Sequence, residues 1–155
     1  MYPVLTIADE MLRIAKRKGR QLTPMQLMKL VYIAHGWSLA VMGRDIFSDR
    51  IEAWKFGPVI PTLYQAAKRF GRDEIPNSLV DDSPSGILDE EMQAFLDDVF
   101  LKYGHLSGIQ LSNLTHMAGT PWSEVYEGGM TNNEISDHLI SRHYLEKLNE
   151  YRQQA

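Results

Sequence analysis

The sequence predicts a mainly α-helical protein of the α+β class: a compact bundle of about six to seven helices around a buried central helix, with a small β-hairpin between the second and third helices. The first observation is a segment from Leu27 to Met42 that is apolar nearly all round, which is typical of a buried helix. The second is the set of capping residues, prolines and glycines that divides the remaining chain into short helical segments. The third is a change of hydrophobic period between Gly43 and Pro58.

The helix boundaries follow from local signals. Thr23 and Ser107 each precede a glutamine by three residues, the spacing of a capping box, and Thr120-Pro121 repeats the threonine–proline start of Thr23-Pro24. The predicted helices run from Thr6 to about Lys18, from Pro24 to Met42, across Leu63 to Phe70, from Asp89 to Tyr103, from Ser107 to about Met117, from Thr120 to about Glu127, and from Ser136 with Ile140, Tyr144, Leu148 and Tyr151 facing inward.

Two non-helical regions stand out. Ile46-Phe47 and Ile51 to Trp54, on either side of a Ser48–Arg50 turn, predict the small hairpin, and Gly57-Pro58 is interpreted as the return to helix. The stretch from Arg72 to Gly86 is rich in Pro, Ser, Asn and Asp. It is predicted to be the loosest region, with room for one more short strand pair, and to become ordered with a partner.

Composition limits the class of protein. At 155 residues the chain fits one domain, expected over 1–152 with a frayed tail at 153–155. There is no cysteine, so disulfides and thiolate metal sites are excluded. No secretion leader and no membrane-spanning run is apparent, which favours a cytoplasmic protein without a membrane partner. The sequence does not fix an oligomeric state.

The charge pattern argues against nucleic acid as the main partner. The net charge is −4, although basic residues gather locally between Arg13 and Arg20 and acidic residues between Asp81 and Asp98. Both clusters are interpreted as solvated helix ends and loops. Binding of nucleic acid through the basic cluster is kept as an alternative.

No pattern predicts catalysis, a cofactor or a metal. Phosphate-binding loops, a nucleophile elbow and a His-Glu-x-x-His helix are all absent from the sequence. His35 and His116 are predicted to be hydrogen-bonded core or capping residues. Any metal site would need ligands that are distant in the sequence.

Large aromatic residues lie at the ends of the predicted elements. Trp54, Phe56 and Tyr64, with Lys55 among them, flank the Gly-Pro turn, and Trp122 follows another proline. Either these rings plug the ends of the core or some of them, with Lys55, bind a protein partner, because aromatic residues concentrate binding energy. Ile51 to Trp54, if an exposed edge strand, is a second candidate surface.

Four motifs together resemble the Panacea domain family, also called SocA-like or phage-associated GepA-like. They are MKLVYIAH at 28–35, IEAWKFGPV at 51–59, LTH at 114–116 and TPW at 120–122, and the resemblance extends from about Met11 to Tyr151. The family-signature residues of the scaffold are Lys29, Leu30, Tyr32, His35, Glu52, Trp54, Gly57, Pro58, His116, Pro121 and Trp122.

The resemblance implies an antitoxin-type protein that neutralises a cognate protein toxin by direct binding and without catalytic residues. One branch of the family implies an alternative, an adaptor that delivers its toxin to a bacterial protease. A phage-associated regulator that binds nucleic acid and an enzyme are further alternatives. The predicted partner is therefore a protein toxin.

Overall fold

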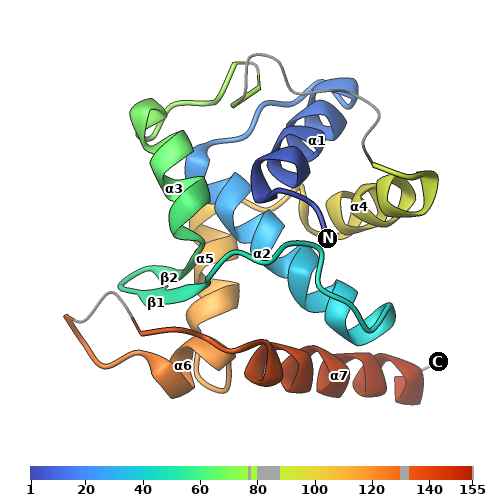
Figure 1. The fold of residues 1–155 in the computed structure, drawn as a ribbon, viewed down its shortest axis with the longest axis vertical. Helices are drawn as coiled ribbons and strands as arrows, with labels where there is room; N and C mark the ends of the chain where they lie inside the picture. The colour runs from blue at the N-terminus through green and yellow to red at the C-terminus, as the bar shows by residue number, and fades with distance from the viewer. Residues whose placement is uncertain (77, 80–87, 130–132, 155) are drawn as a thin grey trace.

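The fold is known from a computed structural model, which describes residues 1–76, 78–79, 88–129 and 133–154. These residues form seven α-helices, one 3₁₀ helix and a two-stranded antiparallel sheet (Figure 1). The predicted class and the number of helices are confirmed. In chain order the elements are α1 (Val4–Arg17), α2 (Pro24–Val41), β1 (Glu52–Trp54), β2 (Gly57–Val59), α3 (Pro61–Ala67), η1 (Lys68–Phe70), α4 (Glu90–Tyr103), α5 (Gly108–His116), α6 (Pro121–Val125) and α7 (Asp137–Gln154).

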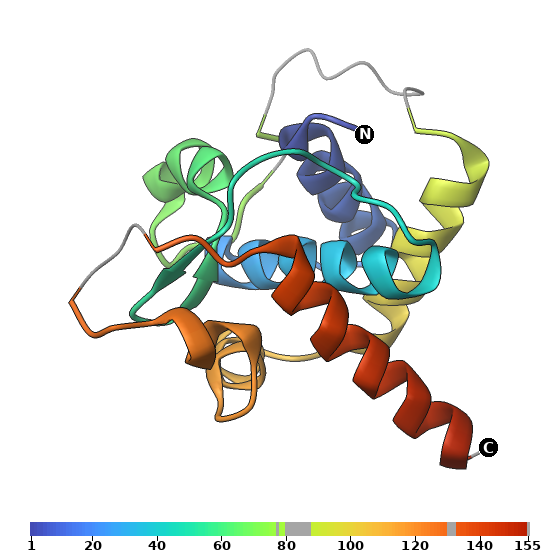
Figure 2. The same cartoon turned by 60° about the horizontal axis from the view of Figure 1, so that its bottom comes forward.

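Helix α2 is the centre of the molecule, as predicted. Every residue from Leu27 to Ser38 is buried, because α1, α3, α4, α5, α7 and β2 all pack against this helix (Figures 1 and 2). Its start is fixed by the predicted capping box: the Thr23 backbone N–H donates to Gln26 Oε1 at 2.9 Å, and the Gln26 N–H donates to Thr23 Oγ1 at 3.3 Å.

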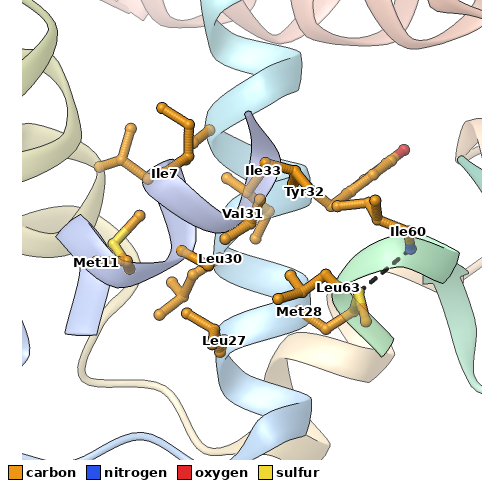
Figure 3. Close-up of a cluster of buried hydrophobic side chains, with 14 of the residues drawn as sticks. Ile7, Met11, Leu27, Met28, Leu30, Val31, Tyr32, Ile33, Ile60 and Leu63 are labelled. Atoms are coloured by element: carbon orange, nitrogen blue, oxygen red, sulfur yellow. Dashed lines mark hydrogen bonds between the residues drawn. The ribbon is translucent and has the colours of Figure 1, made fainter. Parts of the chain in front are cut away.

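The core is built on the sides of α2 (Figure 3). Ile7 and Met11 of α1 lie near Leu27 and Leu30 on one side, and all four are fully buried. On the other side Met28 meets Ile60 and Leu63, and its Sδ accepts a hydrogen bond of 3.3 Å from the Ile60 N–H. The polarisable thioether thus occupies the join between the hairpin and α3.

The hairpin exists, but its predicted pairing is wrong. The partner of β1 is Gly57–Val59, with Ala53 opposite Pro58, and the Ile46-Phe47 segment is not a strand. Gly57-Pro58 therefore belongs to the sheet and not to a return to helix. Gly57 has φ of +119°, which favours glycine after the two-residue Lys55-Phe56 loop.

The second candidate surface depended on Ile51 to Trp54 being an exposed edge strand, and this condition is not met. Residues 133–135 run along the other side of β1: Ala53 N–H donates to Asn133 O at 2.9 Å, and Ile135 N–H donates to Ile51 O at 2.8 Å. Both edges of β1 are occupied, so an added strand from a partner has no place there.

The last helix crosses α2 at very short range. The ring of Tyr144 lies directly against Gly36, where a side chain would overlap it, and Trp37 packs edge-on to the same ring at 5.2 Å. Ile140 and Tyr144 are buried as predicted, whereas Tyr151 is 44% exposed although it stacks on Trp37 at 5.9 Å. Its position near the helix end leaves one side of the ring to solvent. The helix continues to Gln154, so 153 and 154 lie in its last turn.

Two remaining predictions concern element ends and loops. Helix α6 ends at Val125, two residues before the expected end. The part of Arg72 to Gly86 that the structure describes contains no strand, while buried Ile75 donates its N–H to Leu22 O at 2.8 Å. Residues 77 and 80–87, and with them Asp81 and Asp82, lie outside the described residues.

Among the described helices, none has the length and apolar character needed to cross a membrane.

Candidate functional site

A groove lies between the start of α2, the hairpin loop and α3, with a volume of about 340 Å³. The hairpin and α3 are on the same side of α2 in both views (Figures 1 and 2). Met25 and Met28 of α2, Val59 of β2 and Ala67 of α3 provide apolar walls. The charged residues that line it are Lys29, Lys55 and Lys68, and no carboxylate is among the described lining residues. The groove is thus apolar and positively charged.

Four of the five residues predicted to bind a partner line this groove: Trp54, Lys55, Phe56 and Tyr64. Phe56 at the hairpin tip is 59% exposed and Tyr64 is 38% exposed, while Trp54 is half-buried and meets the Tyr64 ring edge-on at 4.8 Å. The Lys55 ammonium lies 5.4 Å from the centre of the Phe56 ring, a cation–π distance. Trp54, Phe56 and Tyr64 are called the aromatic rim of the groove: Trp54 also packs against the core, whereas Phe56 and Tyr64 expose their rings.

The hairpin that carries the rim is braced from behind. Ser112 Oγ of α5 donates to Phe56 O at 2.6 Å, and Trp122 Nε1 of α6 donates to Trp54 O at 2.5 Å. Trp122, the fifth predicted residue, lies outside the groove, stacked on Tyr126 at 4.5 Å and edge-on to His116 at 5.2 Å. Trp122 therefore supports the rim from behind through its hydrogen bond to Trp54.

Lys29 is the most unusual group at the groove. The residue is 2% exposed, and Nζ donates to the Pro58 carbonyl at 2.9 Å. Burial lowers the pKa of Lys29 to about 7, and no carboxylate contributes to that pKa. A Cβ at Gly57 would come within 3.0 Å of Nζ, so the glycine also leaves room for the ammonium.

A second polar cluster joins α2 to α7. The His35 side chain is buried and stacks on Phe47 at 4.4 Å, with Nε2 at 2.9 Å from Asp137 Oδ1 and 3.4 Å from Asp45 Oδ1. The neighbouring Asp137 raises the pKa of Asp45 to about 6, whereas the hydrogen bond with His35 lowers the pKa of Asp137.

These three side chains are the group that could hold a metal ion among the described residues, since their ligand atoms lie within 4.8 Å of one another. The second ring nitrogen of His35, Nδ1, is buried without a hydrogen-bond partner in the part of the chain that the structure describes. A metal-bound histidine ordinarily donates its other N–H to an acceptor. The arrangement fits a hydrogen-bonded tie between helices, the core role predicted for His35.

Three of the five basic residues between Arg13 and Arg20 pair with neighbouring acids. Arg13 Nε and Arg17 contact the two oxygens of Glu10 at 3.1 and 3.7 Å, and Lys18 lies 3.9 Å from Asp97. This pairing supports the interpretation as solvated helix ends and weakens the nucleic-acid alternative.

The other signature residues have structural positions. Leu30 and Tyr32 are buried in the core, Glu52 accepts from Arg50 and from Trp54 Nε1, Pro121 opens α6, and His116 Nδ1 contacts Ser112 O at the end of α5. Sequence reasoning missed the methionine walls and the pairing of Asp45 and Asp137 with His35. It also overlooked the significance of Lys29, a lone cation in an apolar helix.

The chain matches the family model "Antitoxin SocA-like, Panacea domain" over residues 27–123, which include most of α2, the hairpin and most of the residues that line the groove. It belongs to the SocA-like Panacea family. The curated protein "Antitoxin SocA" from Caulobacter vibrioides (strain NA1000 / CB15N) is 32% identical to this chain over 134 residues, which cover 81% of this chain and 71% of that protein. No solved structure matches this chain.

Proposed function

We propose that this SocA-like Panacea protein is an antitoxin that neutralises a cognate protein toxin by direct, non-catalytic binding, and that the groove receives the toxin. The family and the 32% identical relative support the antitoxin class. The single observation that carries the site is the exposed aromatic rim on a braced hairpin.

The rim has the features of a binding hot spot. Phe56 and Tyr64 expose large apolar area next to a concave apolar surface, and truncation of such aromatic anchors is what most weakens protein interfaces. The bonds from Ser112 and Trp122 hold the loop carbonyls in place before any partner arrives. Less conformational entropy is then lost on binding.

An adaptor that delivers the toxin to a protease is the alternative within the same family. An adaptor must hold its toxin as well, so the groove serves both functions. They differ in the fate of the toxin: direct neutralisation leaves its half-life unchanged, whereas delivery to a protease shortens it.

The test is co-expression with the product of the neighbouring gene. That product should be toxic alone and tolerated with the wild-type chain, and Phe56→Ala with Tyr64→Ala should restore toxicity at equal antitoxin abundance. Leu101→Ala is the matched control, because Leu101 is 73% exposed on α4, on the other side of α2. Unchanged toxicity with the wild-type chain would contradict the antitoxin function, and full rescue by the double variant would contradict the groove as the site.

A further inference from the structure

Lys29 is a buried cation that the fold alone does not balance. An ammonium has three donors, and among the described residues the structure gives Lys29 one acceptor, the Pro58 carbonyl. Burial of a charged group is unfavourable unless an opposite charge or several hydrogen bonds compensate it. A neutral side chain could donate the same hydrogen bond to the Pro58 carbonyl. The positive charge of Lys29, which lines a groove, therefore needs a separate explanation.

The remaining charges of the groove have the same sign. Lys55 on the hairpin and Lys68 on η1 line it together with Lys29, and the described lining residues include no aspartate or glutamate. Within low-dielectric walls of methionine and aromatic side chains, three like charges attract an anionic group more strongly than they would in water.

We infer that the groove recognises a toxin segment that presents a carboxylate among apolar side chains, and that Lys29 selects for this carboxylate. The inference rests on the proposed function and names the chemistry of the partner. Apolar side chains of the segment pack against the aromatic rim and against Met25, which is 38% exposed and whose flexible thioether adapts to different shapes. The carboxylate supplies the negative charge that Lys29 lacks.

The protonation of Lys29 gives the inference a measurable signature. With a pKa of about 7, Lys29 is charged at pH 6, and about one molecule in a hundred carries the charge at pH 9. Lys55, Lys68 and Tyr64 face Lys29 across the groove, and Thr115 and His116 lie behind the hairpin on α5. Replacement of Lys29 alone separates its titration from theirs.

The direct experiment uses two small probes, 3-phenylpropanoate and its neutral amide 3-phenylpropanamide. Binding to the full chain is followed by NMR from the indole N–H of Trp54. The wild type should bind the carboxylate at least about tenfold more tightly than the amide at pH 6, and at pH 9 this preference should fall severalfold, because Lys29 has then lost its charge while Lys55 and Lys68 still line the groove. Equal binding of the two probes at pH 6, a preference unchanged at pH 9, or binding of neither probe at Trp54 would overturn the inference.

Variants assign the preference to one residue. Lys29→Met keeps a linear side chain without charge and should lower the preference at pH 6 to the value that the wild type shows at pH 9, while Lys16→Met, at an exposed position of α1, removes an equal charge elsewhere and should leave the preference intact. A full wild-type preference at pH 6 in folded Lys29→Met would overturn the role of Lys29. The pH series on the wild type needs no substitution, so it decides the question even if Lys29→Met does not fold.

The co-expression assay separates this inference from the proposed function. Loss of rescue by Lys29→Met, with rescue kept by Lys16→Met, supports it. Full rescue by wild type and Lys29→Met alike refutes selection by Lys29 and leaves the antitoxin function standing. No rescue by the wild type refutes the antitoxin function, and the probe experiment then still decides the chemistry of the groove.

Discussion

The two halves of α2 are covered in different ways. Its C-terminal half forms a closed seam with α7, where Gly36 allows the Tyr144 ring to lie directly on the backbone and His35 meets two carboxylates. Its N-terminal half borders the groove, where Lys29 is as buried as His35 but has, among the described residues, a carbonyl and no carboxylate as its partner. The same helix therefore has one buried polar side chain with carboxylates beside it and one that the described part of the fold leaves short of a counter-charge.

The difference separates stability from recognition. Substitutions in the seam should change the free energy of unfolding, because the contacts there lie between buried side chains of the same fold. Substitutions at the rim of the groove should change binding with little effect on stability, because Phe56 and Tyr64 are already exposed. Lys29 should affect both.

The largest effect on stability is expected for a substitution at Gly36, in the seam between α2 and α7. Gly36→Ala places a methyl group on the Tyr144 ring and should lower the free energy of unfolding by about 3 to 4 kcal/mol, because α7 must move away. Helix propensity alone would make the same change favourable by about 1 kcal/mol. Urea unfolding gives the sign, and Ala40→Gly, later in α2, is the control for propensity. A stabilised Gly36→Ala variant would contradict the close crossing.

The second largest effect is expected at Lys29, in the pH dependence of the free energy of unfolding. Its pKa is about 7 in the folded chain and near 10.4 in the unfolded chain, so the unfolded state binds more protons between these values. Stability should therefore rise by about 3 kcal/mol from pH 7 to pH 9.5. Urea unfolding across this range measures the slope, which Lys29→Met should remove. An equal slope in wild type and variant would mean that burial does not lower the pKa of Lys29.

A smaller effect concerns the brace of the hairpin. Trp122→Phe removes the hydrogen bond to the Trp54 carbonyl and should cost about 1 kcal/mol. Faster amide exchange across β1 and β2 should accompany the loss. Trp122→Phe with unchanged exchange in the hairpin would show that the rim is held by Ser112 and Lys29 alone.

The smallest effect lies at the polar end of the seam. Proximity to Asp137 raises the pKa of Asp45 to about 6, so the folded state holds that proton more tightly and the resulting stability is lost as pH rises through 6. Asp45→Asn should therefore raise the Tm slightly at pH 7.5 and leave it nearly unchanged at pH 4.5. Asp49→Asn in the same segment is the control. An equal rise at both pH values would contradict the coupling of Asp45 and Asp137.

Local signals in the sequence predicted most of the helices. The capping boxes at Thr23 and Ser107 form as expected, because each depends on residues only three positions apart. The hairpin pairing was missed because proline, which has no N–H to donate to a neighbouring strand, is unusual in a strand, and Pro58 lies opposite Ala53 in this one. The pairing of 133–135 with β1 joins segments about 80 residues apart and leaves no local signal.

The site was predictable in part. A position at element ends selected Trp54, Phe56 and Tyr64, which line one groove, and also Trp122, which packs behind the hairpin. Whether these residues bind a partner stays a prediction. Met25 and Met28 could not be assigned to the groove, because an apolar side chain on a central helix faces core or groove according to what packs over it. Lys29 could have been recognised as a cation in a segment that is otherwise apolar all round.

The most direct test of the groove is hydrogen exchange of the chain alone and in complex with its co-expressed toxin. The proposal predicts new protection from Trp54 to Lys68, over the hairpin tip and α3, with exchange in α4 around Leu101 unchanged. Protection confined to α4, with the hairpin and α3 exchanging as in the free chain, would contradict the groove as the toxin-binding surface.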